Sequence, residues 1–176
     1  MDANEIRRWS DRYDEVYDDD LREIEDRLND ALPKQGYITQ DQLEDVVQWK
    51  LNGQKGRRDL NIEKVNTVPD EFIRRVSEAA FLVKDPALQL KTLKSIPGIG
   101  GATATVILRF NDPKNYAIGD RYIVHEFFGE DRGMRVTDYP KILEELHNRN
   151  PDDFDLRTVE KAYYQRYRDE HEVGDW

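Results

Sequence analysis

One stretch of the chain has residue types suited to holding an anion. Residues 95–110 read SIPGIGGATATVILRF, and the helix-breaking residues Pro97, Gly98, Gly100 and Gly101 interrupt a pattern that is otherwise helical. Because glycine permits positive φ and close backbone approach, two helices can fold back on each other here. The first amides of the second helix would then point outward and, with the helix dipole, could bind one phosphate. The pattern also fits an ordinary turn between helices.

Asp120 is the second residue whose position suggests chemistry. It lies 20 residues after Gly100 and directly precedes the apolar run RYIVHEFFG. An aspartate there caps the following helix, which is worth about 1 kcal/mol, and the helix N-terminus keeps its carboxylate ionised. A capping role and a chemical role are therefore compatible.

The elements that must position these residues are all predicted to be helices. Apolar spacing, caps and helix breakers predict an all-α fold, a compact single domain over residues 1–176 of about seven to eight helices. Residues 88–110 form the helix-hairpin-helix motif, and residues 1–36 form an acidic N-terminal helical extension packed on the domain. The segment NGQKGRRDLN is predicted to be a basic loop. Helices are expected near 21–32, 39–49, 69–83, 85–96, 101–110, 120–128, after Pro140 and after Asp155, and the core face of the third comprises Phe72, Val76, Ala79, Ala80 and Val83.

Charge is distributed unevenly along the chain. The net charge is −10, yet residues 47–124 carry 13 Lys and Arg against 8 Asp and Glu, a local net charge of +5. Because local charge decides what a surface binds, the acidic total does not exclude a nucleic-acid partner. Aspartate runs and an Arg-to-Lys ratio of 17 to 10 suit a high-salt cytoplasm, although an acidic surface also aids solubility.

Composition also excludes several classes of site. The chain has no cysteine, so it cannot form disulfides, zinc–cysteine sites or a cysteine-bound iron–sulfur cluster. No apolar run reaches the ~20 residues of a membrane helix and no signal-peptide pattern is present, so we expect a cytoplasmic protein without a membrane partner. His147 and His171 lack ligand partners at useful spacing and His125 has a structural position, so no metal site is predicted.

The residues around the hairpin resemble the helix-hairpin-helix DNA glycosylase superfamily, which includes endonuclease-III-like base-excision enzymes. The superfamily pattern is met over residues 88–129 by Ile96, Pro97, Gly98, Ile99 and Gly100, by Thr103 and Ala104, and by Asp120. A looser match covers VVQWKLNGQKGRR, PKNYAIGDRYIVHEFFG and FDLRTVEKAYYQ. It resembles a group of small prokaryotic relatives that carry a Trp-Lys pair upstream and have no established activity.

The resemblance implies a DNA partner and assigns roles to particular residues. Asp120 would face C1′ of a flipped nucleotide, stabilise the positive charge that develops as the base departs, and activate the attacking water. Trp49 and Tyr122 could stack on a base, although aromatic residues at helical spacing commonly belong to the core. The hairpin could hold a monovalent cation through backbone carbonyls, and no other cofactor is implied. The phosphate-binding residues would be Gly98, Ile99, Gly100, Gly101, Lys91, Lys94, Lys55, Arg57 and Arg58.

Departures from the superfamily pattern limit the expected activity. Strand-cleaving members use a lysine two residues after the last hairpin glycine, where this chain has Ala102, so a monofunctional DNA N-glycosylase without lyase activity is expected. The usual Asp-Thr-His is Asp120-Arg121-Tyr122 here. The alternatives are a non-catalytic nucleic-acid-binding module and a protein-interaction domain that uses the hairpin as a turn. The base, the choice of DNA or RNA and the oligomeric state stay open.

Overall fold

The structure, a computed structural model, describes residues 1–171 and contains only helices and connecting segments over that range. The predicted all-α class is confirmed, with more helices than the seven to eight expected. The described helices are α1 (Ala3–Glu15), α2 (Asp19–Gln35), α3 (Gln40–Lys50), α4 (Lys55–Asn66), α5 (Asp70–Leu82), α6 (Pro86–Leu93), α7 (Gly101–Asn111), α8 (Arg121–Phe128), the 3₁₀ helix η1 (Val136–Asp138), α9 (Tyr139–Asn148) and α10 (Leu156–Glu170).

The additional helices are α1 and α4. Residues 1–36, expected as one helical extension, form both α1 and α2, whose side chains belong to the same hydrophobic cluster as the rest of the core. The prediction of a basic loop at NGQKGRRDLN was wrong, because α4 begins at Lys55. Only Val65 of α4 is buried, so its apolar periodicity is too weak to show a helix in the sequence.

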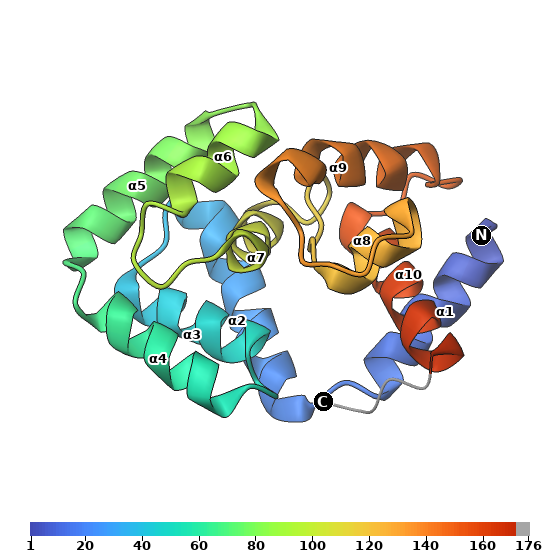
Figure 1. Cartoon of the computed structure of the whole chain (residues 1–176), viewed down its shortest axis with the longest axis horizontal. Coiled ribbons are helices and arrows are strands. Elements are labelled where there is room, and N and C mark those ends of the chain that lie inside the picture. The colour runs from blue at the N-terminus through green and yellow to red at the C-terminus, as the bar shows by residue number, and fades with distance from the viewer. Residues whose placement is uncertain (172–176) are drawn as a thin grey trace.

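Helix α7 lies at the centre of the arrangement (Figure 1), with α2 to α6 on one side and α1, α8, α9 and α10 on the other. It packs against α2, α3 and α6, whereas α10 packs against α1, α8 and α9. Every residue of α7 from Thr103 to Phe110 is buried. The helix that follows the hairpin is therefore the most enclosed element that the structure describes.

Helix boundaries largely follow the local signals in the sequence. The Asp85 carboxylate accepts a hydrogen bond from the Leu88 amide at 2.6 Å, as expected for a cap, but α6 ends at Leu93 rather than near Ile96. The predicted core face of α5 was right at Ala80, which is fully buried, and wrong at Phe72. The helix buries Ile73, Ser77 and Ala80 and leaves Phe72 44% exposed, because the buried stripe is shifted by one residue. No described helix combines the length and the apolar character needed to cross a membrane.

Candidate functional site

The hairpin joins the end of α6 to the start of α7. The Ile99 amide donates to the Ile96 carbonyl at 3.1 Å, and Gly98 has φ +89° in the left-handed region that favours glycine. Gly100 is the N-cap of α7 and supplies no capping side chain. The first amides of α7 therefore lack both an intrahelical acceptor and a cap, as an anion site at a helix N-terminus requires.

Gly98 also lets the hairpin lie directly on α4. A β-carbon at this position would sit 2.8 Å from the Asn61 carbonyl oxygen and 3.2 Å from Cβ of Lys64. The first of these distances is too short for any real side chain, and the obstacle is backbone. A glycine is thus required both by the φ angle and by the close approach of α4.

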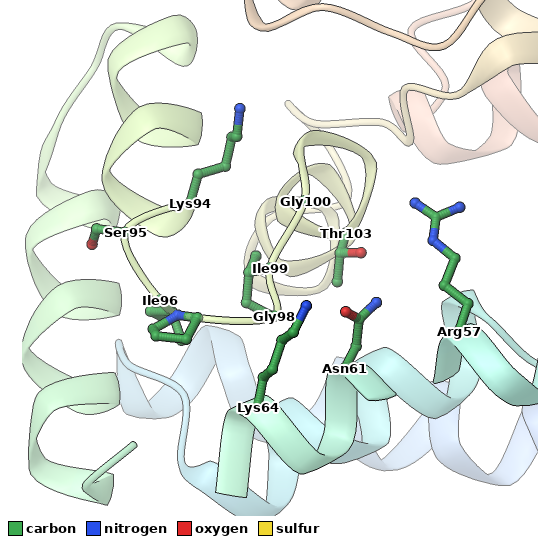
Figure 2. A pocket seen from close by; sticks show the side chains of 11 residues that line it. Arg57, Asn61, Lys64, Lys94, Ser95, Ile96, Gly98, Ile99, Gly100 and Thr103 are labelled. Atoms are coloured by element: carbon green, nitrogen blue, oxygen red, sulfur yellow. The ribbon is translucent and has the colours of Figure 1, made fainter. Parts of the chain in front are cut away.

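A groove of about 340 Å³ lies between the hairpin and α4. Figure 2 shows Arg57, Asn61 and Lys64 projecting from α4 toward the hairpin and the first turn of α7. Of the residues predicted to bind phosphate, the groove brings together Arg57, Lys94, Gly98, Ile99 and Gly100.

The other predicted phosphate-binding residues, Gly101, Lys91, Lys55 and Arg58, do not line this groove. Lys55 and Arg58 form ion pairs with Asp59 at 2.5 and 3.3 Å. The sequence indicates no role for Asn61 and Lys64, because Asn61 lies in the predicted loop and no helix is predicted at Lys64, so neither is assigned to a helical face.

Asp120 occupies the N-cap of α8, as predicted. Its Oδ1 accepts hydrogen bonds from the amides of Tyr122 at 2.9 Å and Ile123 at 3.2 Å. Its Oδ2 lies 3.3 Å from Nζ of Lys50 on α3, and the side chains of Lys50 and Asp120 are only 17% and 13% exposed. Sequence reasoning assigned Lys50 no role, and its only signal was the Trp-Lys pair of the looser resemblance.

The backbone before Asp120 is held by two buried hydrogen bonds. The Gly119 amide donates to Oγ1 of Thr105 on α7 at 3.0 Å, and the Tyr139 hydroxyl donates to the Ala117 carbonyl at 2.8 Å. Because Thr105 lies one turn into the helix that the hairpin begins, the carboxylate and the hairpin are carried by the same buried element.

A cavity of about 20 Å³ adjoins Asp120 and Lys50. It is lined further by Tyr13, Glu160 and Tyr164. A volume of this size can hold one water molecule, to which Lys50, Asp120 and Glu160 offer polar partners, but not a nucleotide. Binding of a flipped base at Asp120 would therefore require Lys50 or its neighbours to move.

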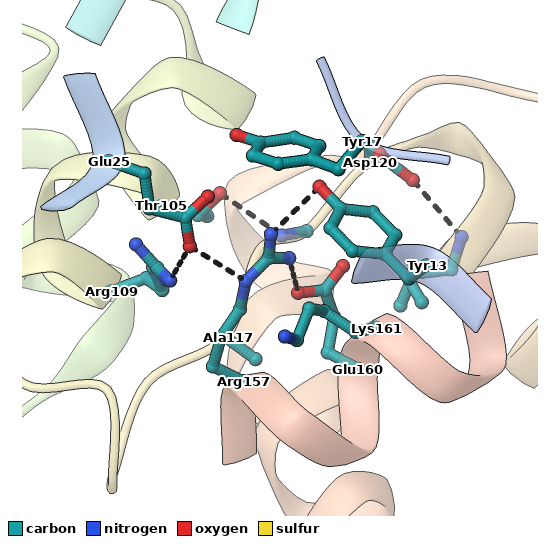
Figure 3. A network of polar contacts seen from close by, with 12 residues as sticks. Tyr13, Tyr17, Glu25, Thr105, Arg109, Ala117, Asp120, Arg157, Glu160 and Lys161 are labelled. Atoms are coloured by element: carbon teal, nitrogen blue, oxygen red, sulfur yellow. Dashed lines mark hydrogen bonds and ion pairs between the residues drawn. The ribbon is translucent and has the colours of Figure 1, made fainter. Parts of the chain in front are cut away.

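A network of buried charges, drawn in Figure 3, borders this cavity, which Tyr13, Arg157 and Glu160 of the network line. Arg157 on α10 forms an ion pair with Glu160 and donates a hydrogen bond to the Tyr13 hydroxyl at 2.9 Å. Its Nε lies 3.9 Å from Oε1 of Glu25 on α2, and Glu25 also pairs with Arg109 of α7. The network joins α1, α2, α7 and α10 in the interior.

The two carboxylates of the network have opposite pKa shifts. Burial alone would raise the pKa of Glu25, but the guanidinium groups of Arg109 and Arg157 outweigh it and lower the pKa to about 2. Burial raises the pKa of Glu160, although Arg157 opposes that change. Of the two carboxylates in the network, Glu25 is thus the more strongly ionised.

The two aromatic residues predicted to stack on a base have different environments. Trp49 is buried in the core, where its Nε1 donates to the Tyr17 hydroxyl and its ring meets Phe110 edge-on at 5.6 Å. Tyr122 is partly exposed, and the Arg121 guanidinium lies 4.8 Å from its ring centroid. Part of the Tyr122 ring, which also packs against Tyr164 and Tyr167, is therefore accessible from outside the core, whereas the Trp49 ring is not.

No candidate metal centre is found among residues 1–171, where no group of three or more histidine or acidic side chains is placed to hold an ion. His125 packs edge-on against Tyr167 and His171, with ring centroids 5.0 and 5.7 Å away. These contacts are consistent with the structural position expected for His125.

Comparisons of the chain with protein-family models, with curated proteins and with solved structures found no match. The resemblance around the hairpin therefore stays an expectation from the sequence motif.

Replacing Gly98 by alanine should destabilise the protein by about 1–3 kcal/mol, because the new β-carbon meets α4 at a strained φ. The control is Gly56→Ala in α4, where a β-carbon meets nothing within 4 Å and stability should hold or rise slightly. Chemical denaturation measures both. A Gly98→Ala variant as stable as the wild type would contradict the described hairpin.

Replacing Glu25 by glutamine should make the free energy of unfolding change less with pH in the acid range. Because the pKa of Glu25 is about 2 when folded and near 4.5 when unfolded, its stabilisation is complete above pH 4.5 and is lost as the pH falls toward 2. The variant should lose about 3 kcal/mol at neutral pH and change less across that window. Asp30→Asn, on the exposed face of the same helix, is the control. If the melting temperatures of the wild type and of Glu25→Gln changed by the same amount between pH 7 and pH 2, this account would be refuted.

Proposed function

We propose that this protein binds DNA through the hairpin and releases a base at Asp120, as a DNA N-glycosylase of the helix-hairpin-helix type. The observation that carries the proposal is the placement of Asp120. The carboxylate is largely buried, accepts two amide hydrogen bonds, and follows a segment anchored to the helix of the hairpin. A capping aspartate needs neither a largely buried lysine partner nor a cavity beside it.

The chemistry follows from charge and position. Departure of the base leaves positive charge on the sugar, and a fixed carboxylate stabilises that charge more effectively than water can. The two amide hydrogen bonds and the contact with Lys50 hold the carboxylate of Asp120 in one position beside the cavity. The cavity beside Asp120 would place one water molecule near the carboxylate that activates it.

Hairpin and carboxylate have separate tasks in this proposal. The uncapped amides of α7 contact a backbone phosphate irrespective of sequence and set the register of the strand. The flipped nucleotide then reaches Asp120, and the partly exposed ring of Tyr122 lies two residues further along the chain. A protein that kept the hairpin but not the reaction would bind DNA without turnover.

Asp120→Asn should reduce base release by at least about 100-fold and leave DNA affinity within a few-fold of wild type. Asparagine caps a helix as well as aspartate does, so the fold should persist. The measurement is base release from duplexes carrying uracil, alkylated or oxidised bases over a range of KCl. Asp18→Asn, at the N-cap of α2, is the matched control. Binding by the wild type without release from any duplex would favour the non-catalytic module.

Lys50 supports a second candidate function, cleavage of the DNA strand at an abasic site. Ala102 removes the lysine that the superfamily pattern places after the hairpin, but Lys50 brings an amine to within 3.3 Å of Asp120 from a different helix. Asp120 could accept the ammonium proton, and the neutral amine could add to the C1′ aldehyde of an opened abasic sugar. Loss of water would give a Schiff base, and loss of the C2′ proton would then break the C3′–O bond and release the 3′ phosphate.

Borohydride trapping on an abasic duplex tests this second function. Wild type should become covalently linked to the DNA, and Lys50→Gln should lose the product almost completely. Lys161→Gln, which removes another partly buried and ion-paired lysine, should still be trapped. If the wild type releases a base but is not trapped, Lys50 only orients Asp120 and the enzyme is monofunctional.

A further inference from the structure

The groove beside the hairpin has a second wall that the hairpin motif does not supply. At 3.6 residues per turn, Arg57, Leu60, Asn61 and Lys64 fall within about 100° of the circumference of α4. We call these four residues the α4 stripe. Three of them line the groove, and the fourth, Leu60, is 51% exposed on the same face.

The cations of the α4 stripe have no acidic partner among residues 1–171. Neither Arg57 nor Lys64 forms an ion pair with any residue in the described part of the chain, and the only hydrogen bond from the Arg57 side chain goes to Gln54 at 3.2 Å. Lys55 and Arg58 of the same helix point to other faces and are paired with Asp59. In a chain with 37 acidic residues, unpaired cations facing a groove are available to an external anion.

The length of the α4 stripe fits a polynucleotide strand better than a single anion. Arg57 and Lys64 are seven residues apart, about 10 Å along a helix that rises 1.5 Å per residue. One strand of DNA advances about 3.4 Å per nucleotide, so the stripe spans about three nucleotides. An exposed leucine between two cations suits the apolar face of a sugar that lies between phosphates.

The two walls of the groove are held at a constant separation. Gly98 lies so close to the Asn61 carbonyl that the hairpin and α4 are in direct backbone contact. Gly100 and Thr103 at the start of α7 and Arg57, Asn61 and Lys64 of the α4 stripe therefore line the same groove. Phosphates bound by one wall would lie within reach of the other.

We propose that α4 is a second phosphate-binding element, which together with the hairpin holds successive phosphates of one DNA strand. This inference rests on the proposed function, because it assumes that DNA is the ligand. It adds that Arg57 and Lys64 contribute two phosphate contacts, that Lys55 and Arg58 contribute none, and that a single strand is sufficient.

The experiment measures affinity by fluorescence anisotropy with a labelled 20-nucleotide duplex and its single strand, between 50 and 200 mM KCl. The test variant is R57Q/K64Q, and the control K55Q/R58Q removes the same charge from the same helix. Two lost contacts lower the salt slope by about 1.8 on duplex and 1.4 on single strand. When KCl rises from 50 to 200 mM, the affinity of the wild type for duplex should therefore fall by a factor about ten times larger than the affinity of R57Q/K64Q does. For the single strand, the factor should be about seven times larger.

The control should keep the wild-type slope on both ligands. Melting curves at each salt concentration verify that all variants are folded. Equal salt slopes for the two double variants would overturn the inference, because the effect would then come from the total charge of the protein and not from the cations that line the groove. A slope change on duplex alone would refute the one-strand arrangement. Failure of wild type to bind either ligand would refute the proposed function itself, whereas binding with an unchanged R57Q/K64Q slope would refute only this inference.

Discussion

Enclosure of α7 on all sides is the constraint on which the rest of the structure depends. Its residues from Thr103 to Phe110 are all buried, so the helix cannot rotate or slide without unpacking α2, α3 and α6. Its N-terminus forms one wall of the groove, and Thr105 holds the segment that ends at Asp120. One buried element therefore sets the distance between the hairpin and the carboxylate of Asp120.

The enclosure requires α7 to bury a charge, since Arg109 lies on it with a side chain only 3% exposed. An unpaired guanidinium in that position would cost several kcal/mol, which Glu25 offsets through direct pairing. Arg157 shares Glu25 and is itself paired with Glu160. Each member therefore depends on the others, and a displacement of α2, α7 or α10 would leave a charge without its partner.

Electrostatics distinguish the groove from the remaining surface of an acidic protein. Many basic side chains are bound to carboxylates, as Lys55 and Arg58 are to Asp59, whereas Arg57, Lys64 and Lys94 around the groove form no ion pair with a described residue. At 0.1 M salt the screening length is about 10 Å, so local cations outweigh the distant acidic surface. If the groove binds DNA as proposed, the contribution of these cations falls in molar salt, and hydrogen bonds from the backbone amides of α7 become more important.

The amino-acid sequence by itself determined the all-α class, the hairpin at Pro97 to Gly101, and the caps at Asp85 and Asp120. These features follow from local chemistry, namely φ preferences, capping hydrogen bonds and apolar periodicity, which neighbouring residues express without the rest of the chain. Only the tertiary structure decided that the basic segment after Gly53 is a helix, that Trp49 is buried, and that Lys50 meets Asp120 across 70 residues. Packing between distant helices sets those pairings, and no local pattern encodes which faces of two helices will meet.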